Sequence, residues 1–144
     1  MTKVNVDFRY VPLEVVPSIW DDIIRVLEKS VGTSGGRFFM HDIFEGVMEK
    51  RYLLWVATID DEIVAAITTR VIVYPNKRGL AMDWIGGKKM MHWLPLAQKA
   101  IEEYAIQIGC EHLEGYGRKA WGRWLEKYGW EPDYIAYKME IKNG

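Results

Sequence analysis

The sequence predicts a single α/β (α+β) domain that spans residues 1–144. The length of 144 residues matches one domain of ordinary size, and 49% hydrophobic residues supply enough apolar side chains for one core. The hydrophobic period switches repeatedly between the values typical of strands and of helices. Residues 83–130 contain in succession an apolar strand, a glycine turn, a long amphipathic helix, a second strand and a short helix.

Charge and cysteine content limit the function classes. Nineteen Lys and Arg residues against 20 Asp and Glu residues give a net charge of -1, so we expect no binding to nucleic acid or to an anionic membrane. Cys110 is the only cysteine, which excludes an internal disulfide and favours a reducing compartment. Residues 1–16 alternate apolar and polar side chains and do not resemble a signal peptide or a spanning helix. We therefore expect a cytoplasmic protein.

The spacing of apolar residues, together with proline and glycine, predicts the first three elements. Alternation over residues 4–10 predicts a first strand. Apolar residues at helical spacing predict a helix over 16–31, with Pro17 near its start. The glycine-rich stretch 32–36 ends this helix, and residues 39–47 fit a second, shorter helix.

A hairpin and a third strand extend this pattern into a meander. Two runs rich in β-branched and aromatic residues, 52–59 and 63–74, flank an acidic turn at Asp60 and Asp61. A further strand over residues 80–85 follows the turn that contains Pro75, Asn76 and Lys77.

The second half begins with the clearest helix. Its start is expected between Met91 and Leu94, because Pro95 is tolerated only in the first turn, and residues 86–90 are then a loop. The helix ends at Gly109, and three elements are expected after it. These are a strand over 110–116, a short helix with Trp121, Trp124, Leu125 and Tyr128 on one apolar face, closed by Gly129, and a last strand over 134–141.

The turn between the fourth strand and the long helix is a candidate anion site. Gly86, Gly87, Lys88 and Lys89 precede the helix, whose first backbone N–H groups are free and whose dipole favours negative charge. Lysines at this end oppose the dipole unless an anion lies between them. The alternatives are that the glycines only turn the chain and that the lysines are solvated loop charges.

Several polar side chains on the adjacent strands are candidates for proton transfer. Asp83 shares a strand face with the apolar Ala81 and Ile85, although a hydrogen-bonded or edge-exposed carboxylate would also explain it. Glu114 and Tyr116 share a face on the next strand, alongside His112; an ordinary polar outer face is the alternative. No set of His, Cys, Asp and Glu residues has the spacing of metal ligands, so we expect no metal.

The order of the elements and the segment EKYGWEPDYIAYKMEI (126–141) resemble the GNAT superfamily of acyl-CoA-dependent N-acetyltransferases. The segment GYGRKAWGRWLEKYGW (115–130) is also similar to the GR-x-x-W segment common in GNAT-like proteins of tailed phages. The resemblance implies a mixed, V-shaped sheet of about six to seven strands with about four helices, and acetyl-CoA between the splayed fourth and fifth strands.

The resemblance also implies roles for particular residues. The backbone near Trp84 and Ile85 would pair with the pantetheine arm, and residues 86–89 would hold the pyrophosphate. Asp83 or Glu114 would accept the proton of an amine acceptor, and Tyr116, Tyr128 or water would protonate the leaving thiolate. The identity of the amine stays open, and the sequence is compatible with a homodimer.

The chain departs from the family pattern in two places. The glycine turn GGKKMMHW (86–93) is shorter than the usual Arg/Gln-x-x-Gly-x-Gly/Ala loop and has no motif arginine. The tyrosine that many family members use as general acid falls on Leu125, which cannot donate a proton. The alternative function is therefore a non-catalytic GNAT-like protein, in phage morphogenesis or host interaction and then in the host cytoplasm.

Overall fold

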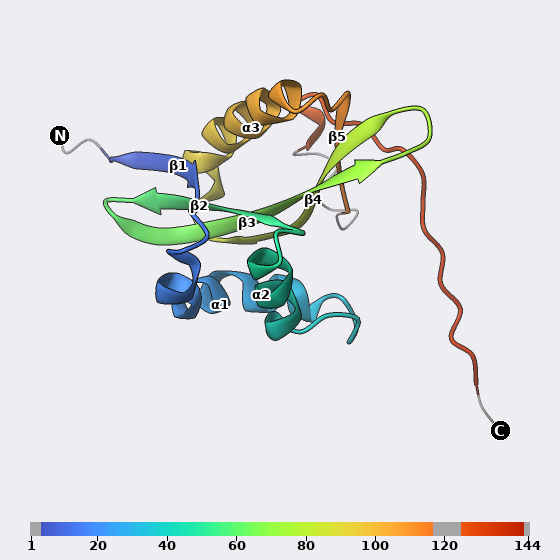
Figure 1. Ribbon diagram of the computed structural model, residues 1–144, viewed down its shortest axis with the longest axis horizontal. Helices are drawn as coiled ribbons and strands as arrows, with labels where there is room; N and C mark the ends of the chain where they lie inside the picture. The colour runs from blue at the N-terminus through green and yellow to red at the C-terminus, as the bar shows by residue number, and fades with distance from the viewer. Residues whose placement is uncertain (1–3, 117–124, 143–144) are drawn as a thin grey trace.

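The computed structural model describes residues 4–116 and 125–142. In this part of the chain a five-stranded mixed sheet has the order β1-β2-β3-β4-β5 and carries three helices (Figure 1). The elements are β1 (Val6–Tyr10), α1 (Val16–Gly32), α2 (Met40–Met48), β2 (Leu53–Ile59), β3 (Glu62–Val73), β4 (Arg78–Gly87), α3 (Met90–Gln107) and β5 (His112–Gly115).

The first four strands form an antiparallel meander, and β5 is added in parallel through α3. Asp60 and Asp61 both have positive φ, 50° and 68°, and join β2 to β3 as the predicted hairpin. Two consecutive residues of this kind match the right-handed twist of the flanking strands. β5 runs parallel to β4, and two parallel neighbours cannot be joined by a tight turn. The chain therefore crosses the sheet through α3 before it enters β5.

The helices cover the two faces of the sheet and create two cores. In Figure 1, α3 lies on one side of the sheet and α1 with α2 on the other. The α3 core is built on Trp93, Ile101 and Ile67, and the α1/α2 core on Leu27 and Ile43. All five side chains are fully buried. The predicted helices at 16–31 and 39–47 are thus confirmed, and each turns one apolar stripe to the sheet.

The junction of β4 and α3 differs from the prediction. The sequence suggested a loop over residues 86–90, but Gly86 and Gly87 still pair with β3, and α3 already begins at Met90. Pro95 therefore lies inside the helix, where it lacks the N–H for the carbonyl of Met91. One missing hydrogen bond near the start of a helix is tolerated because the buried face of α3 stabilises the rest.

The C-terminal part of the chain gives the largest correction. The predicted strand over 134–141 is wrong for this chain on its own, because residues 131–142 are extended without a strand partner and project from the body (Figure 1). We call residues 131–142 the C-terminal arm. The described sheet consequently has five strands instead of six to seven, with three helices instead of about four.

The short helix expected before the arm is described only at its end. Leu125 and Glu126 are helical and Gly129 has a φ of 87°, which confirms the predicted glycine stop. Trp121 and Trp124 lie outside the described residues, as does most of the GR-x-x-W segment. No helix within residues 4–116 and 125–142 has both the length and the apolar character needed to cross a bilayer.

Candidate functional site

Strands β4 and β5 diverge after a short stretch of pairing. They pair from Gly79 opposite His112 to Met82 opposite Gly115, whereas β4 continues to pair with β3 as far as Gly87. Residues 83–87 of β4 therefore have a neighbouring strand, β3, on one side only. An open strand edge can bind the amide groups of an extended ligand as a further strand would. The V-shaped opening is the central feature of the site.

A β-bulge lies where the opening begins. Thr68 of β3 pairs with Trp84, and the next residue, Thr69, pairs with Met82, so Asp83 is the extra residue on β4. Bulges bend a strand and redirect the side chains that follow. Here the bulge directs Asp83 and Trp84 to the α1/α2 side of the sheet.

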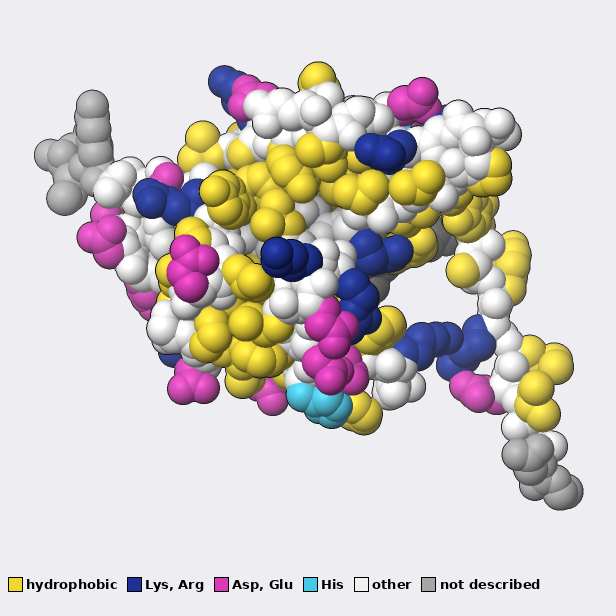
Figure 2. All heavy atoms as spheres, viewed as in Figure 1, with side chains coloured by type: hydrophobic (Ala, Val, Ile, Leu, Met, Phe, Trp, Pro, Cys, Tyr) yellow, Lys and Arg dark blue, Asp and Glu magenta, His cyan; other side chains and the backbone are white. Residues whose placement is uncertain are grey.

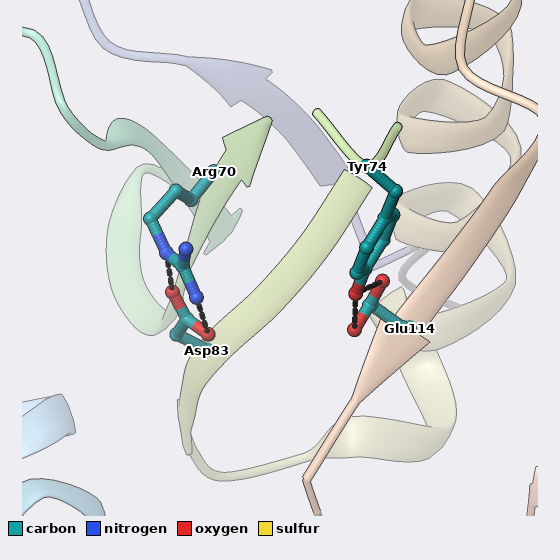
Figure 3. A network of polar contacts seen from close by, with 4 residues as sticks. All are labelled: Arg70, Tyr74, Asp83 and Glu114. Atoms are coloured by element: carbon teal, nitrogen blue, oxygen red, sulfur yellow. Dashed lines mark hydrogen bonds and ion pairs between the residues drawn. The ribbon is translucent and has the colours of Figure 1, made fainter. Parts of the chain in front are cut away.

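Asp83 is held by an arginine from the neighbouring strand. Its Oδ2 accepts a hydrogen bond from Arg70 Nε at 2.7 Å, and its Oδ1 accepts one from Arg70 Nη2 at 3.2 Å (Figure 3). The Asp83 side chain is only 10% exposed. This pair raises the pKa of Arg70 above its usual range, because the hydrogen bond to Asp83 favours the charged guanidinium. Both oxygens of Asp83 are therefore occupied by a permanent positive charge.

Glu114 has neutral or titratable partners instead. Tyr74 donates its hydroxyl to both carboxylate oxygens, at 2.8 and 3.0 Å (Figure 3). His112 Nε2 lies 2.9 Å from Oε1. Gly79 makes this arrangement possible, since a Cβ there would lie 2.6 Å from the His112 ring and 2.8 Å from Glu114. The hydrogen bond to Glu114 is the main reason that the pKa of Tyr74 is raised to about 12.

Tyr116 lies just past the end of β5, beside the opening. Partial burial, followed by the negative charge of Glu114, raises the pKa of its phenol. Tyr134, Asp83 and Arg70 have smaller effects on the same pKa. The structure thus brings the three predicted proton-transfer residues, Asp83, Glu114 and Tyr116, to the point where the strands separate. Their roles remain proposals.

The sequence did not reveal the partners that hold these carboxylates. Arg70 and Tyr74 come from β3 and from the turn after it, 13 and 40 residues away from Asp83 and Glu114 respectively. A usable signal existed only for Arg70, because a charged residue in the long apolar strand β3 requires a partner. Nothing in the sequence specifies the pairing of Tyr74 with Glu114.

Trp84 and Trp93 lie on opposite faces of the sheet. Trp93 is fully buried in the α3 core, and its indole N–H donates to the carbonyl of Lys88 at 2.9 Å. Trp84 packs on the α1/α2 side, edge-on against Phe38 with ring centroids 5.1 Å apart. The connection between α1 and α2 therefore reaches the site through Phe38. Ile85, the other residue expected beside a pantetheine arm, packs against the α3 core.

The turn between β4 and α3 has the features of an anion site. Gly87 has a φ of 136° and contacts β3 so closely that no side chain fits. The backbone at this position therefore requires a glycine whether or not an anion binds. Lys88 donates its backbone N–H to Val64 at 2.9 Å. Lys89 adopts a left-handed conformation with a φ of 58° at the N-terminus of α3, which has no side-chain cap. The first turn of α3 therefore presents uncapped N–H groups beside two exposed lysines.

Within residues 4–116 and 125–142 no three His, Cys, Asp or Glu side chains are grouped so that they could hold a metal ion.

The chain has the fold of GNAT acetyltransferases. Neither a protein-family model nor a curated protein sequence matches it. An aminoglycoside acetyltransferase from an uncultured soil metagenomic sample, solved with sisomicin, is 14% identical with a TM-score of 0.66, over 95% of this chain and 97% of that one. A second soil metagenomic aminoglycoside acetyltransferase is 10% identical with a TM-score of 0.71, over 96% and 99% of the two chains. A transcriptional regulator from Bacillus halodurans is 17% identical with a TM-score of 0.67, over 95% and 100%.

Proposed function

We propose that this protein binds acetyl-CoA or a related acyl-CoA and transfers the acyl group to an amine. The observation that carries the proposal is the divergence of β4 and β5 after Met82 and Gly115, with carboxylates and a phenol gathered at the point of divergence. The similar acetyltransferase structures support it at the level of the fold.

The cofactor-binding part of the proposal uses the open edge of β4 and the turn that follows. The backbone of Trp84 and Ile85 pairs with the amides of the pantetheine arm, in the manner of an added strand. The phosphates are bound by the uncapped N–H groups at the start of α3 and by Lys88 and Lys89. Gly86 and Gly87 position this turn, because they let the end of β4 pack closely against α1 and β3. A bound anion would balance Lys89 at the positive end of the helix, while Lys88 Nζ also lies 3.8 Å from Glu62 Oε1.

In the proposed reaction the amine nitrogen attacks the thioester carbonyl, a C–N bond forms and the C–S bond breaks. The amine proton passes to a carboxylate. Of the two candidates we favour Glu114, since protonation of Asp83 would break its ion pair with Arg70. Tyr116 donates a proton to the CoA thiolate, since a phenol carries its proton at neutral pH.

A second candidate function is non-catalytic binding on the same scaffold. Leu125 favours it, because this position is the one at which the resemblance places a catalytic tyrosine. It is helical and half-buried, with an aliphatic side chain. A protein of this kind would bind an acyl-CoA or a partner without releasing CoA. One similar structure carries the name of a transcriptional regulator and not of an enzyme.

Calorimetry with acetyl-CoA tests the binding step. Lys88→Glu combined with Lys89→Glu should weaken affinity by ~10- to 100-fold, because charge-assisted contacts to phosphate are replaced by repulsion. Lys99→Glu with Lys127→Glu is the matched control, since both are exposed lysines away from the turn. Wild-type binding should also weaken as salt rises. Equal affinity for the two double variants would rule out the turn as the phosphate site.

Turnover then separates the two candidate functions. The wild type is incubated with acetyl-CoA and a broad panel of primary amines, and the free thiol of CoA is measured. Thiol release with any amine supports the transferase. Binding of acetyl-CoA without release under every condition supports the non-catalytic protein.

A further inference from the structure

The ion pair between Arg70 and Asp83 presents its positive end to solvent. The Arg70 side chain is 38% exposed, whereas the Asp83 side chain is only 10% exposed. Asp83 uses both of its oxygens on Arg70, which binds them through Nε and Nη2. A molecule that approaches this point therefore meets a guanidinium and not a carboxylate.

The Arg70 guanidinium keeps a second edge that Asp83 does not use. A guanidinium has five N–H donors, and Asp83 accepts one from Nε and one from Nη2. Within residues 4–116 and 125–142, no acceptor lies within hydrogen-bond distance of Nη1. Nη1 and Nη2 together form the second edge of the fork, and such an edge binds a carboxylate through two parallel hydrogen bonds.

An open cavity of about 660 Å³ adjoins Arg70. The polar and aromatic residues that line it are Tyr10, Lys50, Arg51, Tyr52, Arg70 and Tyr104. Among the residues that the structure describes, no Asp or Glu lines this cavity. Its volume lies in the range of small-molecule sites. The cavity therefore suits a ligand that is partly apolar and carries a negative charge.

Two further cations raise the positive potential around the cavity. Lys50 and Arg51 follow the C-terminal end of α2, and Arg51 forms an ion pair with Glu49 at 3.0 Å. Figure 2 shows Lys and Arg side chains gathered near the middle of the face, beside the position of α2 in Figure 1. The dipole of α2 favours cations at its C-terminal end. Arg70 lies within β3, so a helix dipole does not account for it.

Arg70 and Glu114 flank the same residue of β4. Ala81 pairs with Arg70 of β3 on one side and with Glu114 of β5 on the other. Residues paired in this way share a face of the sheet, and two strand spacings place the Cα atoms of Arg70 and Glu114 about 10 Å apart. In Figure 3, Arg70 and Asp83 lie on one side of β4 and Glu114 lies on the other. A small molecule can therefore contact Arg70 and Glu114 at the same time.

We propose that the acyl acceptor is an amine that carries a carboxylate, and that the second edge of Arg70 binds this carboxylate. The amine then lies beside Glu114, and the products are CoA and an N-acylated amino carboxylate. The apolar part of the acceptor lies in the cavity against Tyr52, whose ring packs on Gly46 of α2. A polycationic amine is disfavoured, because it would meet Arg70 and Lys50. This substrate class rests on the proposed acyl transfer, in which Glu114 accepts the proton of the same amine.

A matched pair of acceptors tests the role of the carboxylate. Phenylalanine and phenylalaninamide differ only in this group, and kcat/KM for each is measured from the thiol of CoA that is released. The wild type should favour phenylalanine at least ~30-fold, because the amide cannot form the charge-assisted pair with Arg70. Spermidine, a polycation, should be a poorer acceptor than either. Equal kcat/KM for the acid and the amide, or a preference for spermidine, would overturn the proposal.

Variants of the ion pair test whether Arg70 is responsible. Arg70→Met with Asp83→Asn removes both charges, so no lone charge is left buried, and should lower the preference for phenylalanine to less than ~3-fold. Arg70→Lys keeps a cation beside Asp83 but lacks the fork, and should lower the preference at least ~10-fold.

The matched control is Arg25→Met with Asp22→Asn, which removes an exposed ion pair of α1 and should keep the wild-type ratio. A wild-type ratio in both Arg70 variants would show that Arg70 does not bind the carboxylate.

Calorimetry in the presence of free CoA measures acceptor binding without transfer, since free CoA has no acyl group to give. Phenylalanine should bind at least ~30-fold more tightly than phenylalaninamide, and the Arg70→Met/Asp83→Asn variant should lose this difference. If this is observed but no amine releases CoA from acetyl-CoA, the proposed transfer fails and the carboxylate site on Arg70 stands. If amines release CoA but phenylalanine does not bind, or its binding does not depend on Arg70, the transfer stands and the carboxylate site fails.

Discussion

Asp83 and Glu114 lie on neighbouring strands, close to the point where β4 and β5 separate, yet they are held by different chemistry. A guanidinium occupies both oxygens of Asp83, whereas a phenol and an imidazole contact Glu114. An ion pair with arginine holds a carboxylate as a fixed charge, while hydrogen bonds from titratable groups allow protons to move. This difference is the reason that we propose Glu114, and not Asp83, as the proton acceptor.

The largest expected effect is that of Glu114→Gln on acyl transfer. If Glu114 accepts the amine proton, the amide should lower the rate by ~100- to 10,000-fold, the range typical of losing a general base. Affinity for acetyl-CoA should be unchanged, since the proposed phosphate contacts lie elsewhere. Steady-state release of CoA measures the first quantity and calorimetry the second.

Glu111→Gln is the control for this experiment. Glu111 is an exposed carboxylate that precedes β5 and makes no contact with the Tyr74 network. A wild-type rate for Glu114→Gln would remove Glu114 from the reaction and return attention to Asp83.

Tyr116→Phe should have the next largest effect, a ~10- to 100-fold slower transfer. The loss is smaller than for Glu114 because water can protonate the thiolate in place of the phenol. The measurement is the rate of CoA release at neutral pH. Tyr137→Phe, a change at a tyrosine that is 89% exposed, is the comparison. Equal rates for the two variants would mean that Tyr116 has no part in proton transfer.

Asp83→Asn should act mainly on stability. The change leaves Arg70 without its partner and should lower the free energy of unfolding by about 1–3 kcal/mol. The loss is smaller than for a fully buried ion pair, because the Arg70 side chain is 38% exposed and water partly screens its charge. Transfer should fall less than ~10-fold. Urea unfolding of Asp83→Asn, Arg70→Met and the double variant should show that the two effects are not additive. Additive effects would show that the pair contributes nothing of its own.

The smallest effect concerns Tyr74 at high pH. Its pKa of about 12 in the folded protein lies above the ordinary value near 10. The folded state therefore holds the proton more tightly, and the contribution of this group to stability is complete below pH ~10 and is lost as the pH rises toward 12. Unfolding of Tyr74→Phe should depend less on pH in this window than unfolding of the wild type. Identical pH profiles would contradict the assignment of the hydrogen bond to Glu114.

Local features of the fold could be predicted from the sequence. Nearby residues determine the hairpin at Asp60 and Asp61 and the helix end at Gly129. The apolar stripe of α1 is also predictable, because its spacing is visible within a single helix. The ends of α3 show the limit. Pro95 suggested a later start, but the packing of the helix against the sheet outweighs one lost hydrogen bond.

The candidate site was predictable in position but not in detail. Asp83, Glu114 and Tyr116 could be identified as polar residues on adjacent strands. The register that brings Arg70 to Asp83 depends on a bulge, and the hydrogen bond from Tyr74 depends on pairing between distant segments. Neither is determined by a pattern within a single strand.

The arm shows a related limit. Residues 134–141 carry the alternation of a strand as clearly as Leu53–Ile59, which has a neighbour on each side. The alternation of apolar and polar residues indicates which side of a strand is apolar, but it does not indicate which surface covers that side. The alternation therefore predicted a strand, but it could not show that residues 134–141 lie without a strand partner in the structure.

The bulge at Asp83 divides β4 into two parts with opposite phase. Met82 and Ile85 both face the α3 core although three positions separate them, and Trp84 faces the other core. Removal of one residue here would restore a regular ladder and turn the end of the strand over, with the Trp84 indole driven into the α3 core. We therefore expect a one-residue deletion at this point to be worse tolerated than any single substitution in β4. The length of the strand, and not only its composition, is under constraint.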